Sequence, residues 1–363
     1  MSMRTIDFSY RVLRNGAFFG TLQAPEAGAP MIRMDQSAEI KTAMSGTFAP
    51  LVLDADGNSV APNWLSDEIQ PTLIIDGAES PLGVFAAAAV TPVEAEGVET
   101  LQMEAYDRCW KVRDNNLENR LYIAAGTNYI TAIEQQLVAS SIPVILATPT
   151  SATLTEDREW DIGTSRLTIV NELLGEINYN PLWFSAQGYA MLEPASVPSP
   201  ENIEHRLSDE PEEILAGADR IDRLLPQISR ETDVYNTPNV FVVTCANPDK
   251  TANMVATAEN TNPQSPLSVS RRGRRIVKMT QLDNIASQTE LQAYADRQRN
   301  MSMIGGETIR VSTSLLPGYG VNDVVALRWK DLSALCILRA YTMELRVGGT
   351  MSMQMERVVY NFD

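Results

Sequence analysis

The stretch "LLGEINYNPLWFSAQGYAMLEP" (residues 173–194) contains the most aromatic part of the chain, with Tyr179, Trp183, Phe184 and Tyr189. Its first residues continue a helical pattern, but Pro181 bars the helix from running on, and the glycine before "YAMLEP" favours a turn. The pattern therefore predicts a helix followed by a β-hairpin. Such an aromatic cluster is either the buried face of the hairpin or a stacking platform for a sugar or a base.

The helix before this hairpin offers an apolar stripe against which the hairpin can pack. In "SRLTIVNELLGEIN" the stripe consists of Leu167, Val170, Leu173, Leu174 and Ile177. We expect the hairpin to cover it with Leu182, Phe184, Tyr189 and Met191. No convergent polar group accompanies the aromatic residues, which favours a buried face. Trp183 falls on the opposite side of the strand and keeps the sugar platform as an alternative.

An earlier segment also has a helical period. Thr127 suits the N-cap position, and the apolar residues after it, Ile130, Ile133, Leu137 and Val138, recur at helical spacing. Two helices and a hairpin together predict a small α+β domain. The polar, Pro-rich residues 195–235 predict a solvated connection with one short helix around "EEILAGADRIDRLL", because ten acidic residues face four arginines between Glu201 and Val234.

The N-terminal part of the chain is rich in strand patterns. Ile6, Phe8, Tyr10 and Val12 alternate with polar residues, and "RNG" predicts a tight turn into "AFFGTL". Further strand-like runs are "PMIRMDQSAEIKTAMSGTF", "QPTLIIDG", "LGVFAAAAVTPV" and "ETLQMEAYDRCWKV". Several short strands at this spacing predict a small barrel or sandwich over residues 1 to about 120.

The strand signal returns from Tyr235. "NVFVVTCAN" and "RRIVKMTQ" predict strands on either side of the loop "NPDKTANMVATAENTNPQSPLS", and "SQTELQAYADRQRN" predicts a helix with a capping box from Ser287 to Glu290. The last segments predict a β-meander, in which Ile309, Val311 and Thr313 share one face of the first strand. These segments are "ETIRVSTSLLPGYGVNDVVALRW", "ALCILRAYTMELRVGG" and "TMSMQMERVVYNF".

Composition excludes several kinds of protein. The formal charge of −17 and the pI near 4.6 repel phosphate backbones, so we do not expect a protein that grips nucleic acid. No apolar run approaches the roughly 20 residues of a membrane span, and the N-terminal residues lack the apolar core of a signal peptide. Cys109, Cys245 and Cys336 are isolated from one another, which predicts reduced core thiols rather than disulfides or a zinc site.

We predict no catalytic, cofactor-binding or metal-binding residue. His205 lies in the acidic segment "ENIEHRLSDE" without a GxSxG elbow or a Cys/His pair, and is interpreted as an exposed surface residue. The cluster from Asp209 to Glu213 predicts a solvated face. "PGYG" (317–320) and "MIGGE" (303–307) predict turns rather than phosphate cradles. Composition leaves a paired-acid glycosidase open, without any positive sign of one.

One basic patch stands out in "SRRGRRIVK". It contains Arg271, Arg272, Arg274, Arg275 and Lys278. In a chain of this net charge we expect the patch to meet acidic surface, either on a neighbouring subunit or in residues 201–234, rather than free DNA.

The order of these segments resembles the baseplate hub, or tail-tip hub, proteins of tailed bacteriophages and related contractile injection particles. The resemblance is carried by "AYDRCWKVRDN", "LLGEINYNPLWFSAQGYAMLEP", "YNTPNVFVVT", "SQTELQAYADRQ" and "ETIRVSTSLLPGYGVNDVVAL", and it covers nearly the whole chain. It implies an α+β, β-dominated fold with two tail-tube-like β-barrel domains, residues 1–121 and 235–363. A smaller α+β insertion domain with the acidic connection would span residues 122–234.

The resemblance also implies a structural role without enzymatic activity or cofactor. Three chains would form a pseudo-sixfold ring that joins the tail tube to a central spike or fibre. Its partners would be the tail tube, distal tail and tape measure proteins, and DNA would pass through the ring without specific binding. We expect a virion location at the tail tip, with assembly in the bacterial host cytoplasm. The alternatives are a glycan-binding or cell-wall-degrading tail-tip protein and a tail-tube or distal-tail ring protein.

Overall fold

The computed structural model describes residues 5–23, 29–95, 97–195, 198–210, 221–232, 237–245, 254–263, 265, 267–282 and 288–358. These residues group into two compact units. Unit 1 comprises Met1–Val197, Ser314–Val321 and Ala340–Ser352, and unit 2 comprises Pro198–Thr313, Asn322–Arg339 and Met353–Asp363. The three-domain division with limits near residues 121 and 234 stays a prediction.

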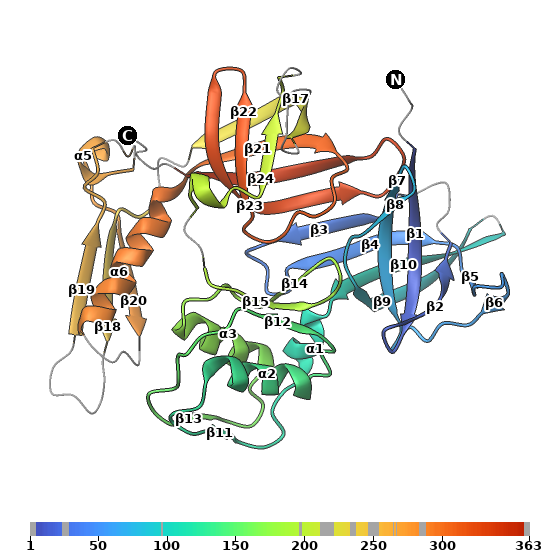
Figure 1. Cartoon of the computed structure of the whole chain (residues 1–363), viewed down its shortest axis with the longest axis horizontal. Coiled ribbons are helices and arrows are strands. Elements are labelled where there is room, and N and C mark those ends of the chain that lie inside the picture. Colours follow the sequence, from blue (N-terminus) through green and yellow to red (C-terminus); the bar gives the residue numbers. More distant parts are fainter. Residues whose placement is uncertain are drawn as a thin grey trace. The chain divides into compact units, whose positions relative to one another are not determined.

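Unit 1 is built on a large antiparallel sheet (Figure 1). Its main strands are β1 (Ile6–Arg14), β2 (Ala17–Leu22), β3 (Met31–Asp35), β4 (Thr42–Phe48), β7 (Glu68–Ile75), β9 (Phe85–Ala95) and β10 (Val98–Asp107). Short strands β5 (Val52–Leu53) and β6 (Ser59–Val60) extend it beyond β2, and β8 (Ala78–Pro81) pairs with β7. The strand order is β3-β4-β10-β9-β7-β1-β2, and the end of β23 (Leu332–Glu344) pairs with β3.

The predicted N-terminal hairpin is confirmed. Tyr10 and Val12 are buried on one face of β1, and the turn to β2 has positive φ at Asn15 (51°) and Gly16 (77°). A turn with this backbone matches the twist of the two strands it joins. One nearby prediction is wrong, because "CWKV" at the end of a predicted strand lies in helix α1 (Cys109–Asp114). Asp107 accepts a hydrogen bond from the amide of Cys109 and so helps to start that helix.

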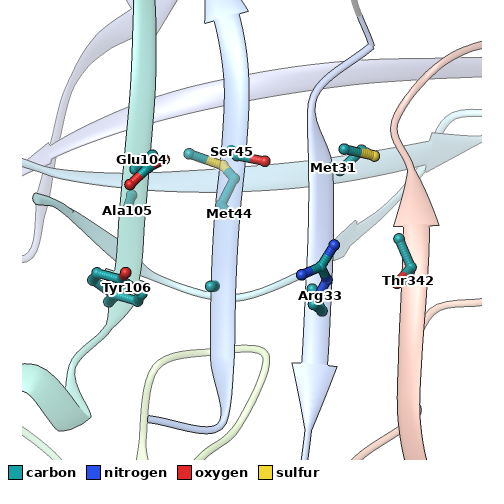
Figure 2. A pocket seen from close by; sticks show the side chains of 9 residues that line it. Met31, Arg33, Met44, Ser45, Glu104, Ala105, Tyr106 and Thr342 are labelled. Atoms are coloured by element: carbon teal, nitrogen blue, oxygen red, sulfur yellow. The ribbon is translucent and has the colours of Figure 1, made fainter. Parts of the chain in front are cut away.

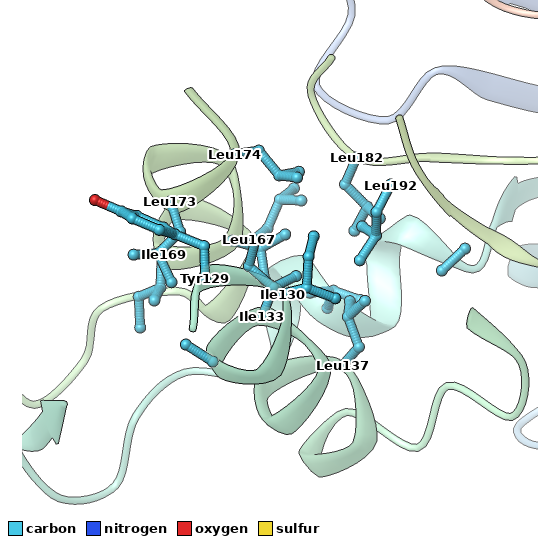
Figure 3. Packing of buried hydrophobic residues seen from close by; sticks show 14 of the residues in the cluster. Tyr129, Ile130, Ile133, Leu137, Leu167, Ile169, Leu173, Leu174, Leu182 and Leu192 are labelled. Carbon is cyan, nitrogen blue, oxygen red and sulfur yellow. The ribbon is translucent and has the colours of Figure 1, made fainter. Parts of the chain in front are cut away.

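A first module, residues 109–195, lies within unit 1. After α1 it contains β11 (Leu121–Ile123), α2 (Tyr129–Ala139), β12 (Ile145–Ala147), β13 (Arg158–Trp160), α3 (Arg166–Glu176), β14 (Trp183–Phe184) and β15 (Ala190–Leu192). Both predicted helices are confirmed, and the stripe of α3 packs with Ile130, Ile133 and Leu137 of α2 in one core (Figure 3). Two details are wrong: Asn128 rather than Thr127 caps α2, and Val138 is 66% exposed.

The aromatic hairpin is also confirmed, with a different register from the predicted one. β14 and β15 pair antiparallel, with Trp183 opposite Met191 and Phe184 opposite Ala190. Leu182 and Phe184 are buried as predicted, but Ala190 and Leu192 face the core instead of Tyr189 and Met191. The side-chain period of two means that a one-residue difference in register exchanges the faces.

Unit 2 contains a closed barrel of six strands. They are β16 (His205–Ser208), β17 (Ile221–Thr232), β21 (Ile304–Ser314), β24 (Thr350–Val358), β23 and β22 (Val324–Trp329), in this order around the ring. The 3-10 turn η1 (Pro200–Asn202) precedes β16. Ile309, Val311 and Thr313 are buried on one face of β21, as predicted. The α+β, β-dominated fold class is therefore confirmed.

The barrel corrects three sequence predictions. Residues 205–208 and 221–232 are barrel strands rather than a solvated connection, and residues 221–225 are not helical; residues 211–220 lie outside the described ones. "MIGGE" enters β21 instead of forming a turn. The predicted meander is interrupted, because β21 lies beside β17 and β24 and not beside β22.

A second module, residues 240–303, also belongs to unit 2. A three-stranded sheet has the order β19 (Met254–Glu259), β18 (Val240–Cys245), β20 (Val277–Leu282), and helix α6 (Gln288–Met303) packs mainly on β19 and β18. The short helix α5 (Val269–Arg272) precedes β20. The strand β19 was predicted as loop, which is wrong. The helix α6 is confirmed, while Ser287 of the predicted capping box lies outside the described residues.

Candidate assembly site

One face of the unit 1 sheet is open, and a shallow groove runs over it. The groove has a volume of about 200 Å³, and Figure 2 shows its lining by side chains of β3, β4, β10 and β23, among them Met31, Arg33, Ser45, Glu104 and Tyr106. Residues alternating with these, such as Ile32 and Met103, are buried on the other face. This face therefore presents a mixture of apolar, polar and charged side chains, including Met31, Ser45 and Glu104.

Each unit contains an ion-pair cluster that joins neighbouring elements of that unit. In unit 1 the Glu68 carboxylate of β7 accepts hydrogen bonds from Arg108 (2.6 and 3.0 Å) and Lys111 (2.7 Å). Glu68 and Arg108 side chains are each only 6% exposed. Burial alone would raise the pKa of Glu68, but the hydrogen bonds and charges of Arg108 and Lys111 outweigh it, so the pKa is lowered. The carboxylate is therefore held charged inside the protein.

The same arginine fastens the aromatic hairpin. Arg108 Nη1 donates to the carbonyl oxygen of Gly188 (2.8 Å), in the turn between β14 and β15. Gly188 has φ +77°, and a Cβ atom there would lie 2.8 Å from Val84, so the turn requires glycine. Arg108 thus connects β7 of the sheet with the hairpin of the first module, and we call Glu68, Arg108 and Gly188 the clamp.

Unit 2 has a comparable cluster on its barrel. Glu307 of β21 pairs with Arg230 of β17 and with Arg357 of β24 (3.0 Å). Burial would raise the pKa of Glu307, but hydrogen bonds from both arginines lower it overall. The cluster joins three neighbouring barrel strands. Cys336, buried nearby, has its pKa raised to about 12, mainly by burial.

Asp107 is a buried carboxyl group at the start of α1. Its oxygens accept hydrogen bonds from the amides of Thr42 and Cys109, each at 2.9 Å. Burial raises the pKa of Asp107 to about 7 against the opposing effect of these bonds and of Lys41. Lys41 Nζ itself donates to the carbonyl oxygens of Gln36 and Ala38. These groups are engaged in structural hydrogen bonds rather than facing a cavity.

His205 is not the exposed residue that its acidic surroundings indicated. It begins β16, and its Nε2 lies 2.9 Å from Asp323 Oδ2, with both side chains mostly buried. Asp209 and Glu210 of the predicted acidic face contact the backbone of Lys330 and the side chain of Arg328, whereas residues 211–213 lie outside the described part. "PGYG" forms an irregular loop, with Gly318 at φ +92°, rather than the regular turn that was predicted.

Members of the basic patch make local contacts in unit 2. Arg275 pairs with Glu259 (2.6 Å), Arg271 donates to the carbonyl of Pro263, and Arg272 donates to the carbonyl of Thr237. The ion pair of Arg275 is thus made with β19 and not with residues 201–234. Whether the patch meets a neighbouring subunit stays a prediction.

The remaining sequence predictions concern chemistry. The three cysteines are free and buried, which confirms reduced core thiols. Across the described ranges, no group of His, Cys, Asp and Glu side chains could hold a metal ion, and no helix is long and apolar enough to cross a membrane. Trp183 is half-buried, and its indole Nε1 is buried without a hydrogen-bond partner; the sugar platform at this residue stays a prediction. The clamp was not predicted, because its members are 40 and 80 residues apart.

Comparison with solved structures identifies proteins of the same fold. No family model matches the sequence, and no curated protein matches it. Among solved structures, the tail protein from Neisseria meningitidis is similar with a TM-score of 0.65 at 12% identity, covering 96% of each chain. The 43 kDa tail protein of prophage MuSo2 from Shewanella oneidensis has a TM-score of 0.66 at 10% identity, covering 97% of this chain and 98% of that one.

A third similar structure comes from a secretion system. It is an E. coli component of the type VI secretion system that itself resembles bacteriophage T4 tail proteins, with a TM-score of 0.51 at 9% identity over 97% of this chain and 77% of that chain. All three likenesses extend over nearly the whole of this chain. The chain therefore has the fold of bacteriophage tail proteins.

Proposed function

We propose that this chain is a structural protein of a phage tail tip, a baseplate hub. Three copies form a pseudo-sixfold ring that joins the tail tube to the central spike or fibre and lines the DNA channel. The observation that carries the proposal is the likeness over 96% and 97% of this chain to two phage tail proteins. A fold alone does not fix a function, so the charge and the sites must agree with the role.

The negative charge of the chain is compatible with a role in lining a DNA channel. With a formal charge of −17, a ring of three copies carries a large excess of acidic groups. Acidic groups along the channel repel the phosphates of passing DNA, and the counterion release that drives binding to basic proteins does not occur. The open face of the unit 1 sheet, which includes Glu104 and Ser45 together with Arg33, is the candidate lining.

The shifted acidic groups support a role without catalysis. An enzyme places carboxyl groups of perturbed pKa in a cleft, where they meet the substrate. Here Glu68 and Glu307 are occupied by arginines, and Asp107 by backbone amides. Each of them holds elements of the fold together.

The native mass of the purified full chain, followed by negative-stain images, tests the proposal. We expect a trimer of about three times 40.0 kDa with a central hole. A hexameric ring would indicate a tail-tube or distal-tail protein instead. A monomer that releases product from cell wall or glycan would overturn the proposal in favour of a tail-tip enzyme.

A further inference from the structure

Strand β20 is an edge of the second module, and its first residues, Val277 to Met279, are left exposed by the described part of the module. It pairs with β18 on one side, and the sheet ends there in the described part of the chain. Helix α6 packs mainly on β19 and β18. Val277 and Met279, on one face of β20, are 52% and 71% exposed, and Lys278 on the other face is exposed as well. An edge strand with exposed apolar side chains is a site at which another chain can add.

The surroundings of this edge are basic. Arg274 and Arg275 precede Lys278 in the sequence, separated from it only by Ile276 and Val277. Both arginines are exposed, and Arg275 forms an ion pair with Glu259. We call Val277, Lys278 and Met279 with this rim the β20 edge. Its partner should be apolar on one face and acidic on the other.

A segment of that description occurs in unit 1 of the same chain. Strand β9 pairs with β7 only at Phe85 and Ala86, so that beyond Ala86 the β9–β10 hairpin has no further strand on that side among the described residues. We call this part, residues 87–95 and 98–102, the acidic arm. Pro92 within it lacks an N–H group, which is typical of strands that lie at an edge.

The acidic arm has acidic side chains on one face and an exposed apolar side chain on the other, which complements the β20 edge. Glu94 and Glu99 are exposed and lie directly opposite each other across the hairpin. Like charges in such a cross-strand pair repel, and a cation between them would relieve the repulsion. Val98, on the opposite face of β10, is 62% exposed.

We propose that the acidic arm of one copy docks on the β20 edge of a neighbouring copy. Side by side, Val98 meets Val277 and Met279 on one face, and Glu94 and Glu99 meet Lys278 on the other. Because Pro92 interrupts hydrogen bonding along β9, side chains rather than an added strand make the contact. A contact between different surfaces of identical chains propagates around a ring. The inference rests on the proposed function for the presence of neighbouring copies.

Carbodiimide cross-linking of the full chain tests the contact, because this reagent joins a carboxylate and an amine only where they touch. Unlabelled and ¹⁵N-labelled chains are mixed, and linked peptides are identified by mass spectrometry. We expect mixed-isotope peptides in which Lys278 is joined to Glu94 or Glu99. Lys278→Arg keeps the charge but removes the amine, so the link should disappear while the native mass stays unchanged.

Charge reversal gives an independent measurement. Glu99→Lys should weaken self-association roughly fivefold for each reversed pair, and Lys278→Glu in the same chain should restore it. Glu118→Lys, an exposed glutamate of the first module, changes the net charge equally and should have no effect.

The outcomes separate the two proposals. A ring that forms without mixed-isotope links to Lys278, and that Glu99→Lys does not weaken, overturns the docking contact and leaves the hub intact. A chain that stays monomeric at about 1 mM, where even a millimolar contact would be half formed, overturns the contact between copies. Links within one copy alone would also overturn it.

Discussion

The two modules that interrupt the β structure are fastened in different ways. The first module packs two helices and a hairpin around one apolar core, and the clamp ties its hairpin to strand β7. The second module covers one face of a three-stranded sheet with a single helix through a smaller core of described residues. The first half of its strand β20, Val277 to Met279, is exposed, while Leu282 at the other end packs against that core. Both modules leave apolar side chains exposed, among them Val138 and Ile162 in the first and Val277 and Met279 in the second, so the difference lies in the clamp and in the size of the described core.

This difference indicates what each module is for. Apolar surface removed from water contributes about 25 cal/mol for each Å², so a strand left bare within a module gains that free energy only when a partner covers it. A module with such an edge can add stability to an assembly, and the clamp adds rigidity within its own chain.

Glu68→Gln should have the largest effect on stability. The substitution leaves Arg108 buried without a full charge partner, so we expect the free energy of unfolding to fall by about 3–5 kcal/mol. Urea unfolding followed by tryptophan fluorescence measures the loss. Glu159→Gln removes an exposed partner of Arg120 and should cost about 0–1 kcal/mol. Equal losses in the two variants would mean that the clamp contributes no more than a surface pair.

Leu173→Ala comes next, because it opens a cavity in the core of the first module. Leu173 is fully buried in α3, in the core cluster that α3 shares with α2 and the hairpin (Figure 3). We expect a loss of about 2–5 kcal/mol in the same unfolding experiment. Val138→Ala on the neighbouring helix, where the side chain is 66% exposed, should change stability by less than about 0.5 kcal/mol. A small loss for Leu173→Ala would show a core that readily collapses.

The predictability of these regions from sequence differs for a physical reason. The stripe of α3 and the alternation in β1 are local patterns, and both were predicted. Strand β17 was missed because its polar residues and Pro226 resemble a solvated connection. The structure places a register shift between Leu224 and Ile228, where Pro226 is tolerated.

Contacts between distant residues leave no local pattern. Arg108 finds Glu68 and Gly188 across 40 and 80 residues, and nothing around any of the three indicates the other two. Trp183 and Met191 illustrate a smaller failure. The hairpin could be predicted from Pro181 and the turn, but its register depends on tertiary packing against α3.

The pH dependence of stability should report Asp107, which ties α1 of the first module to strand β4. Its pKa is about 7 in the folded chain and about 3.8 in the unfolded chain. The unfolded chain therefore releases this proton first, and stability should fall as the pH rises from about 4 to about 7, by at most about 1.4 kcal/mol for each pH unit.

Asp107→Asn should flatten this dependence, although it also weakens the hydrogen bonds to Thr42 and Cys109. Unfolding in urea at pH 5 and pH 7 compares the two chains. The lowered pKa of Glu68 has the opposite effect on stability: it lets stability fall as the pH decreases, but only at pH values below about 4.5, the ordinary pKa of that group. An unchanged slope in Asp107→Asn would show that Asp107 is ionised throughout this range.

Met279→Ala should have the smallest effect on the isolated chain and so gives the sharpest contrast within the second module. Met279 is 71% exposed, and its truncation should change the free energy of unfolding of the monomer by less than about 0.5 kcal/mol. Leu291→Ala on α6, at a fully buried position on the other side of the same sheet, should cost about 2–5 kcal/mol. If Met279→Ala destabilised the dilute monomer as much, β20 would be covered within its own chain. If it instead weakened only self-association, the β20 edge would be a surface that becomes covered when copies assemble.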